Sequence, residues 1–120
     1  EPQDMLSVLF PEKWLARPDA LEYFPYDFPE SDSNILNRQV VACDNWFKEG
    51  GGTTSRLSSF NKETLLITGD QDIGTPWRNT LIMQPLIDGA RMLIIPGGGH
   101  GLMYQYPYDF SNHILTFLEE

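Results

Sequence analysis

Two loops carry the residues of this sequence whose types could do chemistry together. One loop, residues 69–76, holds Asp70 and Asp72, and the other, residues 96–101, holds His100 behind three glycines. Each loop directly follows a short apolar run that is typical of a strand covered on both faces. A carboxylate that accepts a hydrogen bond from one ring nitrogen of a histidine fixes the tautomer and stabilises the imidazolium. The two loops therefore indicate an acid–histidine pair that serves as a general base.

The elements around these loops alternate between strand and helix. Residues 64–68 and 91–95 are the two predicted strands, and helices are predicted to begin at Thr75-Pro76 and near Pro107. Thr75 is the expected N-cap of the first of these helices, because proline suits the position that follows a cap. Strands and helices that alternate at these lengths predict a βαβα unit with parallel strands, and hence an α/β fold. Because the carboxyl ends of parallel strands lie at one edge of a sheet, we expect both loops to meet there.

The second half of the chain resembles the C-terminal half of the α/β-hydrolases. The strand that ends in Gly69-Asp70-Gln71-Asp72 and the stretch 90–101 are similar to the acid loop and the histidine loop of that family. The resemblance implies that Asp72 is the acid and His100 the base of a catalytic triad, with Asp70 as the alternative acid. It also implies a small-molecule substrate and no cofactor. We expect a carboxylate oxygen of Asp72 within about 3.5 Å of a ring nitrogen of His100.

The first part of the chain has a different composition. Residues 1–32 hold five of the nine prolines among many aromatic side chains, a mixture that disfavours long helices and sheet interiors. We interpret this segment as short helical turns and extended pieces that lie on another surface and have no core of their own. A helix is predicted from Ser33, with Asp32 or Ser33 as its N-cap and Cys43 as a small core residue on its apolar stripe.

The resemblance divides the chain into two parts and leaves one component missing. Residues 1–56 match a lid-like helical segment, and residues 57–120 match the C-terminal βαβα part of the hydrolase core. Family members carry a nucleophile in a Gly-x-Ser-x-Gly elbow ahead of the lid. The sequence has no such pattern, and Ser55, Ser58 and Ser59 lie in a polar connection with no strand before them. We therefore interpret the chain as the C-terminal part of a serine-type hydrolase whose nucleophile lies upstream, and we expect the chain alone to be inactive.

Several alternatives stay open at this stage. The bond cleaved could be an ester, a thioester or a related bond in a small apolar substrate, because esterases, epoxide hydrolases, carbon–carbon hydrolases and haloperoxidase-like enzymes share these loops. A rival interpretation is a non-catalytic interaction or scaffold protein that keeps a hydrolase-like core. The cluster Tyr104–Tyr108 fits equally well as the wall of a cleft and as packing for the last helix.

The composition sets limits on partners. A net charge of −9 disfavours nucleic acid, and no run approaches the roughly 20 apolar residues of a membrane span. The glycines before His100 lack the lysine of a phosphate-binding loop, and the acids lack the spacing of a calcium loop, so neither nucleotide nor metal is expected. His113 is expected on a helix surface. The single cysteine excludes an intrachain disulfide framework and favours a reducing, cytoplasmic compartment. An uncovered strand edge predicts self-association.

Overall fold

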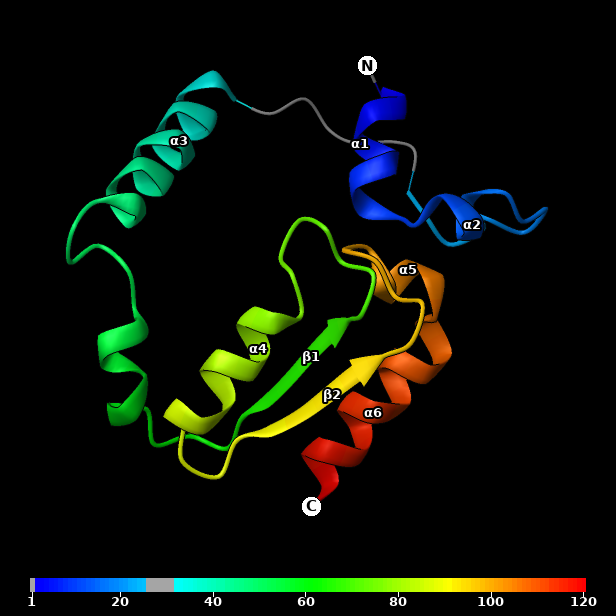
Figure 1. The fold of residues 1–120 in the computed structure, drawn as a ribbon. Coiled ribbons are helices and arrows are strands. Elements are labelled where there is room, and N and C mark those ends of the chain that lie inside the picture. Colours follow the sequence, from blue (N-terminus) through cyan, green and yellow to red (C-terminus); the bar gives the residue numbers. More distant parts are fainter. Residues whose placement is uncertain (1, 26–31) are drawn as a thin grey trace.

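A two-stranded parallel sheet lies at the centre of the second half of the chain (Figure 1). The computed structural model describes residues 2–25 and 32–120. Strand β1 spans Leu65–Gly69 and strand β2 spans Arg91–Ile95. The two strands run in parallel, with the first residues of both strands opposite each other and the last residues likewise. The predicted parallel pair is confirmed, and the first strand begins one residue later than expected.

Helices follow each strand. Helix α4 spans Arg78–Met83 and continues as the 3₁₀ helix η2 at Gln84–Leu86. Helix α5 spans Leu102–Gln105 and helix α6 spans Pro107–Glu119. Figure 1 shows α4 beside β1 and α6 beside β2, so the predicted order of strand, helix, strand and helix is confirmed. None of the helices within the described ranges is both long and apolar enough to cross a membrane.

The start of α4 differs from the expectation. The prediction that Thr75 caps this helix is wrong, because α4 begins at Arg78 after an N-cap at Trp77. The backbone N–H and the hydroxyl of Thr75 donate to the Asp72 carboxylate instead. The turn that holds the acid therefore extends through Thr75, and the helix begins only after it.

Residues 2–25 form two short helices and a buried aromatic cluster. Helix α1 spans Pro2–Leu9 and helix α2 spans Glu12–Leu15. Phe10, Trp14 and Phe24 are buried, with ring centroids 4.8 Å apart for Phe10 and Trp14 and 5.4 Å apart for Phe10 and Phe24. The prediction that this segment has no core of its own is wrong, because the turns that follow α2 bring Phe24 back onto Phe10. Residues 26–31 of the proline-rich segment lie outside the described residues.

Helix α3 stands apart from the sheet (Figure 1). It spans Ser33–Phe47, and the Asp32 side chain caps it by accepting a hydrogen bond from the Asn34 backbone at 2.7 Å, as predicted. All of its residues are exposed, including Cys43. The prediction that Cys43 is a core residue is wrong, because an apolar stripe is buried only where another element covers it, and no described element covers α3. The 3₁₀ helix η1, Thr54–Ser59, leads from α3 to the sheet.

Candidate active site

The acid turn at the end of β1 holds Asp72 by both carboxylate oxygens. Oδ1 accepts hydrogen bonds from the backbone N–H groups of Gly74 and Thr75, at 2.9 and 2.8 Å. Oδ2 accepts a hydrogen bond from the Thr75 hydroxyl at 2.9 Å. The Asp72 side chain is only 5% exposed, so these bonds take the place of the water that a carboxylate otherwise needs. An aspartate bound to N–H groups two and three residues further on is a local turn device, which fixes the carboxylate without help from distant residues.

The histidine loop at the end of β2 is held from behind by a buried amide. Gln105 Oε1 accepts a hydrogen bond from the Gly99 backbone N–H at 2.6 Å, and Gln105 Nε2 donates to the Gly97 carbonyl at 3.2 Å. Gln105 is itself buried, on α5. Because both ends of the amide bind the loop, the path of the glycines ahead of His100 is tied to the helix that follows.

The two loops also contact each other through their backbones. The Gln71 N–H donates to the Gly98 carbonyl at 2.9 Å, and the Asp70 carboxylate accepts from the Gly97 N–H at 2.7 Å. A Cβ atom on Gly69 would lie 2.0 Å from the Gly98 carbonyl oxygen, so this approach requires glycine. Asp70, the alternative acid, therefore binds the backbone of the histidine loop, and no contact joins it to the imidazole.

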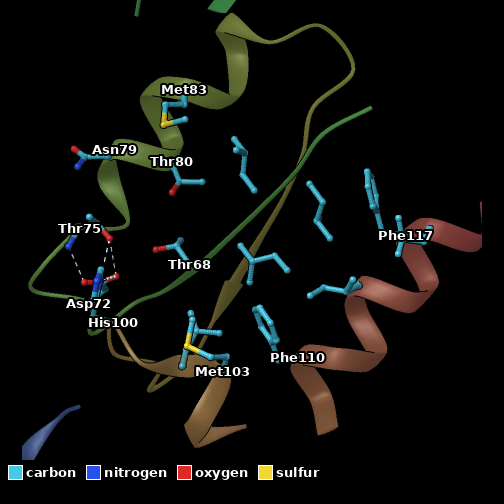
Figure 2. Close-up of a pocket in the computed structure, with 16 residues that line it drawn as sticks. Thr68, Asp72, Thr75, Asn79, Thr80, Met83, His100, Met103, Phe110 and Phe117 are labelled. Carbon is cyan, nitrogen blue, oxygen red and sulfur yellow. Dashed lines mark hydrogen bonds and ion pairs between the residues drawn. The ribbon is translucent and has the colours of Figure 1, made fainter. Parts of the chain in front are cut away.

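Asp72 and His100 form a hydrogen-bonded pair across the two loops (Figure 2). Asp72 Oδ2 lies 3.1 Å from His100 Nδ1, within the distance that the sequence predicts. A carboxylate only accepts hydrogen bonds, so Nδ1 is the donor and Nε2 carries the lone pair. The His100 side chain is 41% exposed, in contrast to its buried partner. The arrangement thus leaves an accessible ring nitrogen that can accept a proton, next to an acid that can stabilise the resulting charge.

The surroundings of Asp72 keep it ionised. Burial raises the pKa of the Asp72 carboxyl, but the hydrogen bonds from the Thr75 backbone, from His100 and from the Thr75 hydroxyl together outweigh it. The net result is a pKa below the ordinary value for an aspartate. At neutral pH the imidazole therefore faces a full negative charge.

A pocket of about 730 Å³ opens beside the pair. Figure 2 shows Asp72, Thr75 and His100 at one end of this pocket and Phe117 of α6 at the other. The lining between these ends is mainly apolar and comes from β1, α4, α5 and α6. Strand β1 reaches the pocket because, among the described strands, it pairs on one edge only. The dyad thus borders an apolar space wide enough for further protein or an apolar ligand.

Two residues of the site, Thr75 and Gln105, were not identified from the sequence pattern. Thr75-Pro76 resembles a helix start, which hides the role of Thr75. Gln105 lies among tyrosines, and a single amide in an aromatic cluster is the signal that could have indicated its role. Within that cluster, Tyr104 packs against Phe24 at 5.2 Å between ring centroids, and no tyrosine of the cluster lines the pocket that contains His100. Tyr104 therefore packs on the aromatic cluster of residues 2–25, a role that differs from both alternatives, the wall of a cleft and packing for the last helix.

The remaining candidate side chains do not line this pocket. Ser55, Ser58 and Ser59 are exposed on η1, and His113 is exposed on α6, as expected for a helix surface. Within residues 2–25 and 32–120, no group of three or more His, Cys, Asp or Glu side chains is arranged to hold a metal ion. Among these candidates in the described part of the chain, Asp72 and His100 are the acid and histidine that the structure brings together.

Known proteins resemble most of this chain. Residues 30–120 match the sequence profile of the TAP-like protein family. A 2-hydroxy-6-oxo-6-(2'-aminophenyl)hexa-2,4-dienoic acid hydrolase of Metapseudomonas resinovorans is 35% identical over 84 residues, which are 68% of this chain and 29% of that protein.

Solved structures extend the similarity to the fold. A serine hydrolase involved in carbazole degradation matches with a TM-score of 0.58 and 30% identity, over 72% of this chain and 35% of that one. Est816, an N-acyl homoserine lactone degrading enzyme, matches with a TM-score of 0.71 and 22% identity, over 95% of this chain and 45% of that one. The chain therefore spans less than half the length of each of these proteins.

Proposed function

Because this chain belongs to the α/β-hydrolase superfamily and has hydrolases among its relatives, we propose that it is the C-terminal part of a serine-type hydrolase. In this proposal Asp72 and His100 are the acid and the base of a catalytic triad, and a segment outside the 120 residues supplies the nucleophile. The observation that carries the proposal is the 3.1 Å contact between Asp72 Oδ2 and His100 Nδ1, with Nε2 left free.

Each member of the pair has a distinct task. His100 Nε2 takes the proton of the attacking hydroxyl, while its Nδ1–H stays bound to Asp72. Asp72 remains ionised throughout and stabilises the imidazolium. The hydroxyl oxygen bonds to the substrate carbonyl carbon, and the imidazolium gives its proton to the leaving group as the scissile bond breaks. A water molecule, which gives a proton to the same Nε2, then attacks the acyl group and releases it from the nucleophile, whose oxygen takes that proton back. The depressed pKa of the Asp72 carboxyl supports this division, because it keeps the proton on the ring.

Two features support a nucleophile from outside the chain. The sequence has no strand followed by a Gly-x-Ser-x-Gly elbow, and the chain spans less than half the length of its relatives. The apolar pocket beside β1 offers a surface against which a further part of the core would pack. In this scheme residues 1–56 act as a lid-like segment and residues 57–120 as the C-terminal part of the core.

The substrate class we propose is a small, fairly apolar molecule with an ester, thioester or related bond. The Metapseudomonas relative is named for a 2-hydroxy-6-oxo-dienoic acid, so that acid is a second substrate to assay. An ester and the dienoic acid can be assayed with the same enzyme preparation, so one set of variants tests both substrates.

The test uses the complete protein, meaning the polypeptide that contains this chain together with its nucleophile. We expect the complete protein to hydrolyse p-nitrophenyl butyrate or the dienoic acid, and residues 1–120 alone to show no turnover. His100→Ala should abolish turnover, and Asp72→Asn should lower kcat by about 10³–10⁴-fold, because an amide favours the wrong histidine tautomer. His113→Ala and Asp88→Asn, both exposed, are the matched controls.

Three outcomes would contradict the proposal. Full activity in both variants would remove the catalytic assignment. An increase in KM with kcat unchanged would identify the two residues as binding groups. A complete protein without turnover on either substrate would favour the non-catalytic scaffold alternative.

A further inference from the structure

The Thr75 hydroxyl closes a triangle of polar atoms with the proposed pair. Thr75 Oγ1 lies 2.9 Å from Asp72 Oδ2 and 3.3 Å from His100 Nδ1 (Figure 2). We propose that Thr75 is a positioning residue, whose hydroxyl holds Asp72 Oδ2 in line with His100 Nδ1 during proton transfer. This role rests on the proposed function of the pair, and nothing in the triad scheme itself requires it.

The two oxygens of Asp72 are held in different ways. Oδ1 is bound by two backbone N–H groups, those of residues 74 and 75, and the bond from residue 75 does not require a particular side chain there. Oδ2 is bound only by side chains, the Thr75 hydroxyl and the His100 ring. If His100 moves, the hydroxyl is the remaining group that fixes the direction of Oδ2. The oxygen that faces the histidine thus depends on the identity of residue 75.

Local sequence makes this hydroxyl rigid. Pro76 restricts the backbone of the residue before it to extended conformations, and the branched Cβ of threonine limits its side-chain rotamers. The Thr75 N–H bond to Asp72 Oδ1 adds a third restraint on the same residue. The hydroxyl is therefore pre-organised, and little entropy is lost when it binds the carboxylate.

The hydroxyl can serve both states of the histidine. When the ring is charged, Oδ2 accepts hydrogen bonds from both Thr75 and Nδ1–H, which favours the ionised carboxylate and keeps the proton on the ring. When the ring is neutral and tilts away from Oδ2, Thr75 Oγ1 is close enough to accept a hydrogen bond from the Nδ1–H group. In both states Nδ1 stays protonated, so Nε2 stays the reactive nitrogen.

The test compares three substitutions in the complete protein. Thr75→Val removes the hydroxyl at nearly constant shape, Thr75→Ser keeps the hydroxyl, and Thr116→Val makes the same chemical change at an exposed site on α6. We expect Thr75→Val to lower kcat on p-nitrophenyl butyrate by about 10- to 100-fold with KM within about twofold, because a hydrogen bond to a charged group is lost. The kcat of Thr75→Ser should stay within about threefold of the wild-type value, and the kcat of Thr116→Val should equal the wild-type value.

Two further measurements separate positioning from a general structural role. In an Asp72→Asn background, Thr75→Val should change kcat by less than about twofold, because the hydroxyl acts through the carboxylate. In ¹⁵N spectra of the histidine rings, the wild type and Thr75→Ser should show one Nδ1–H tautomer at His100, and Thr75→Val a mixture of tautomers. Thermal unfolding checks that each variant is folded, and Thr75→Ser supplies the comparison if the valine variant is not.

The outcomes that overturn the inference are specific. Thr75→Val with wild-type kcat and a single tautomer would show that the hydroxyl does not position the acid. A serine variant as slow as a folded valine variant would show the same. If the wild-type complete protein has no turnover, the proposed function fails, whereas the ring spectra still decide whether Thr75 orders the pair.

Discussion

The segment 2–25 and the loops 69–76 and 96–101 are held by different forces. Buried aromatic rings hold the first segment, whereas hydrogen bonds between carboxylate, amide and backbone groups hold the two loops. Apolar burial has little directional preference and tolerates small shifts, but proton transfer requires a fixed geometry, which directional bonds provide. Aromatic packing is enough to hold segment 2–25, whereas the two loops, which carry the proposed reacting groups, need directional bonds.

The two regions meet along the histidine loop. The Gly101 N–H donates to the Leu9 carbonyl at 2.7 Å, and a Cβ atom on Gly101 would lie 2.4 Å from the Phe10 ring. The residue next to His100 is thus packed against the aromatic cluster. Removing one anchor from each region tests whether rings hold the first and polar bonds hold the second.

Removing the Phe10 ring should have the largest effect on stability. Phe10 is 1% exposed and contacts both other rings of the cluster, so Phe10→Ala should lower the free energy of unfolding by about 3–5 kcal/mol. Urea denaturation of the complete protein measures this. Phe60→Ala, at a half-exposed ring, is the control and should change stability far less. A loss for Phe10→Ala no larger than that of the control would mean that the cluster does not anchor the segment.

Removing the Gln105 amide should have an intermediate effect. Gln105→Ala leaves the Gly99 N–H and the Gly97 carbonyl without their partner, and unsatisfied buried groups cost about 1–3 kcal/mol. Urea denaturation again gives the value, with Gln39→Ala on exposed α3 as the control. Hydrogen exchange at Gly99 should also become faster. An unchanged rate at Gly99 would contradict the view that polar contacts hold this loop.

Acid should weaken the polar region through Asp72. Because the pKa of the folded Asp72 carboxyl is below its ordinary value, its stabilising contribution is complete above about pH 4 and is lost as the pH falls through the folded pKa. The difference in unfolding free energy between wild type and Asp72→Asn should therefore narrow as the pH falls from about pH 5 to about pH 3. Urea titrations across this range measure it, with Asp88→Asn as the control for a lost surface carboxylate. A difference that stays constant down to pH 3 would contradict the predicted linkage.

Much of the fold of the second half could be read from the sequence. The two apolar runs, their glycine-rich ends and Pro107 are local signals, and parallel pairing then places Asp72 and His100 at one edge, as the 3.1 Å contact shows. The catalytic role of this pair remains a prediction, since distance alone does not establish turnover.

Other features could not be read in this way. The prediction that Thr75 caps a helix is wrong because the same Thr-Pro pair can also end the turn that holds an acid. The burial of Gln105 depends on a loop six to eight residues away folding back onto it.

Local sequence specifies which segments form strands, where the loops follow them and which side chains those loops carry, because these depend on periodicity and on glycine and proline. What covers each apolar face depends on tertiary packing: Phe10, Trp14 and Phe24 form a core, whereas Cys43 is exposed on the apolar stripe of α3. The physical reason is that a pattern specifies a face that gains from burial, and the element that buries it is supplied from elsewhere.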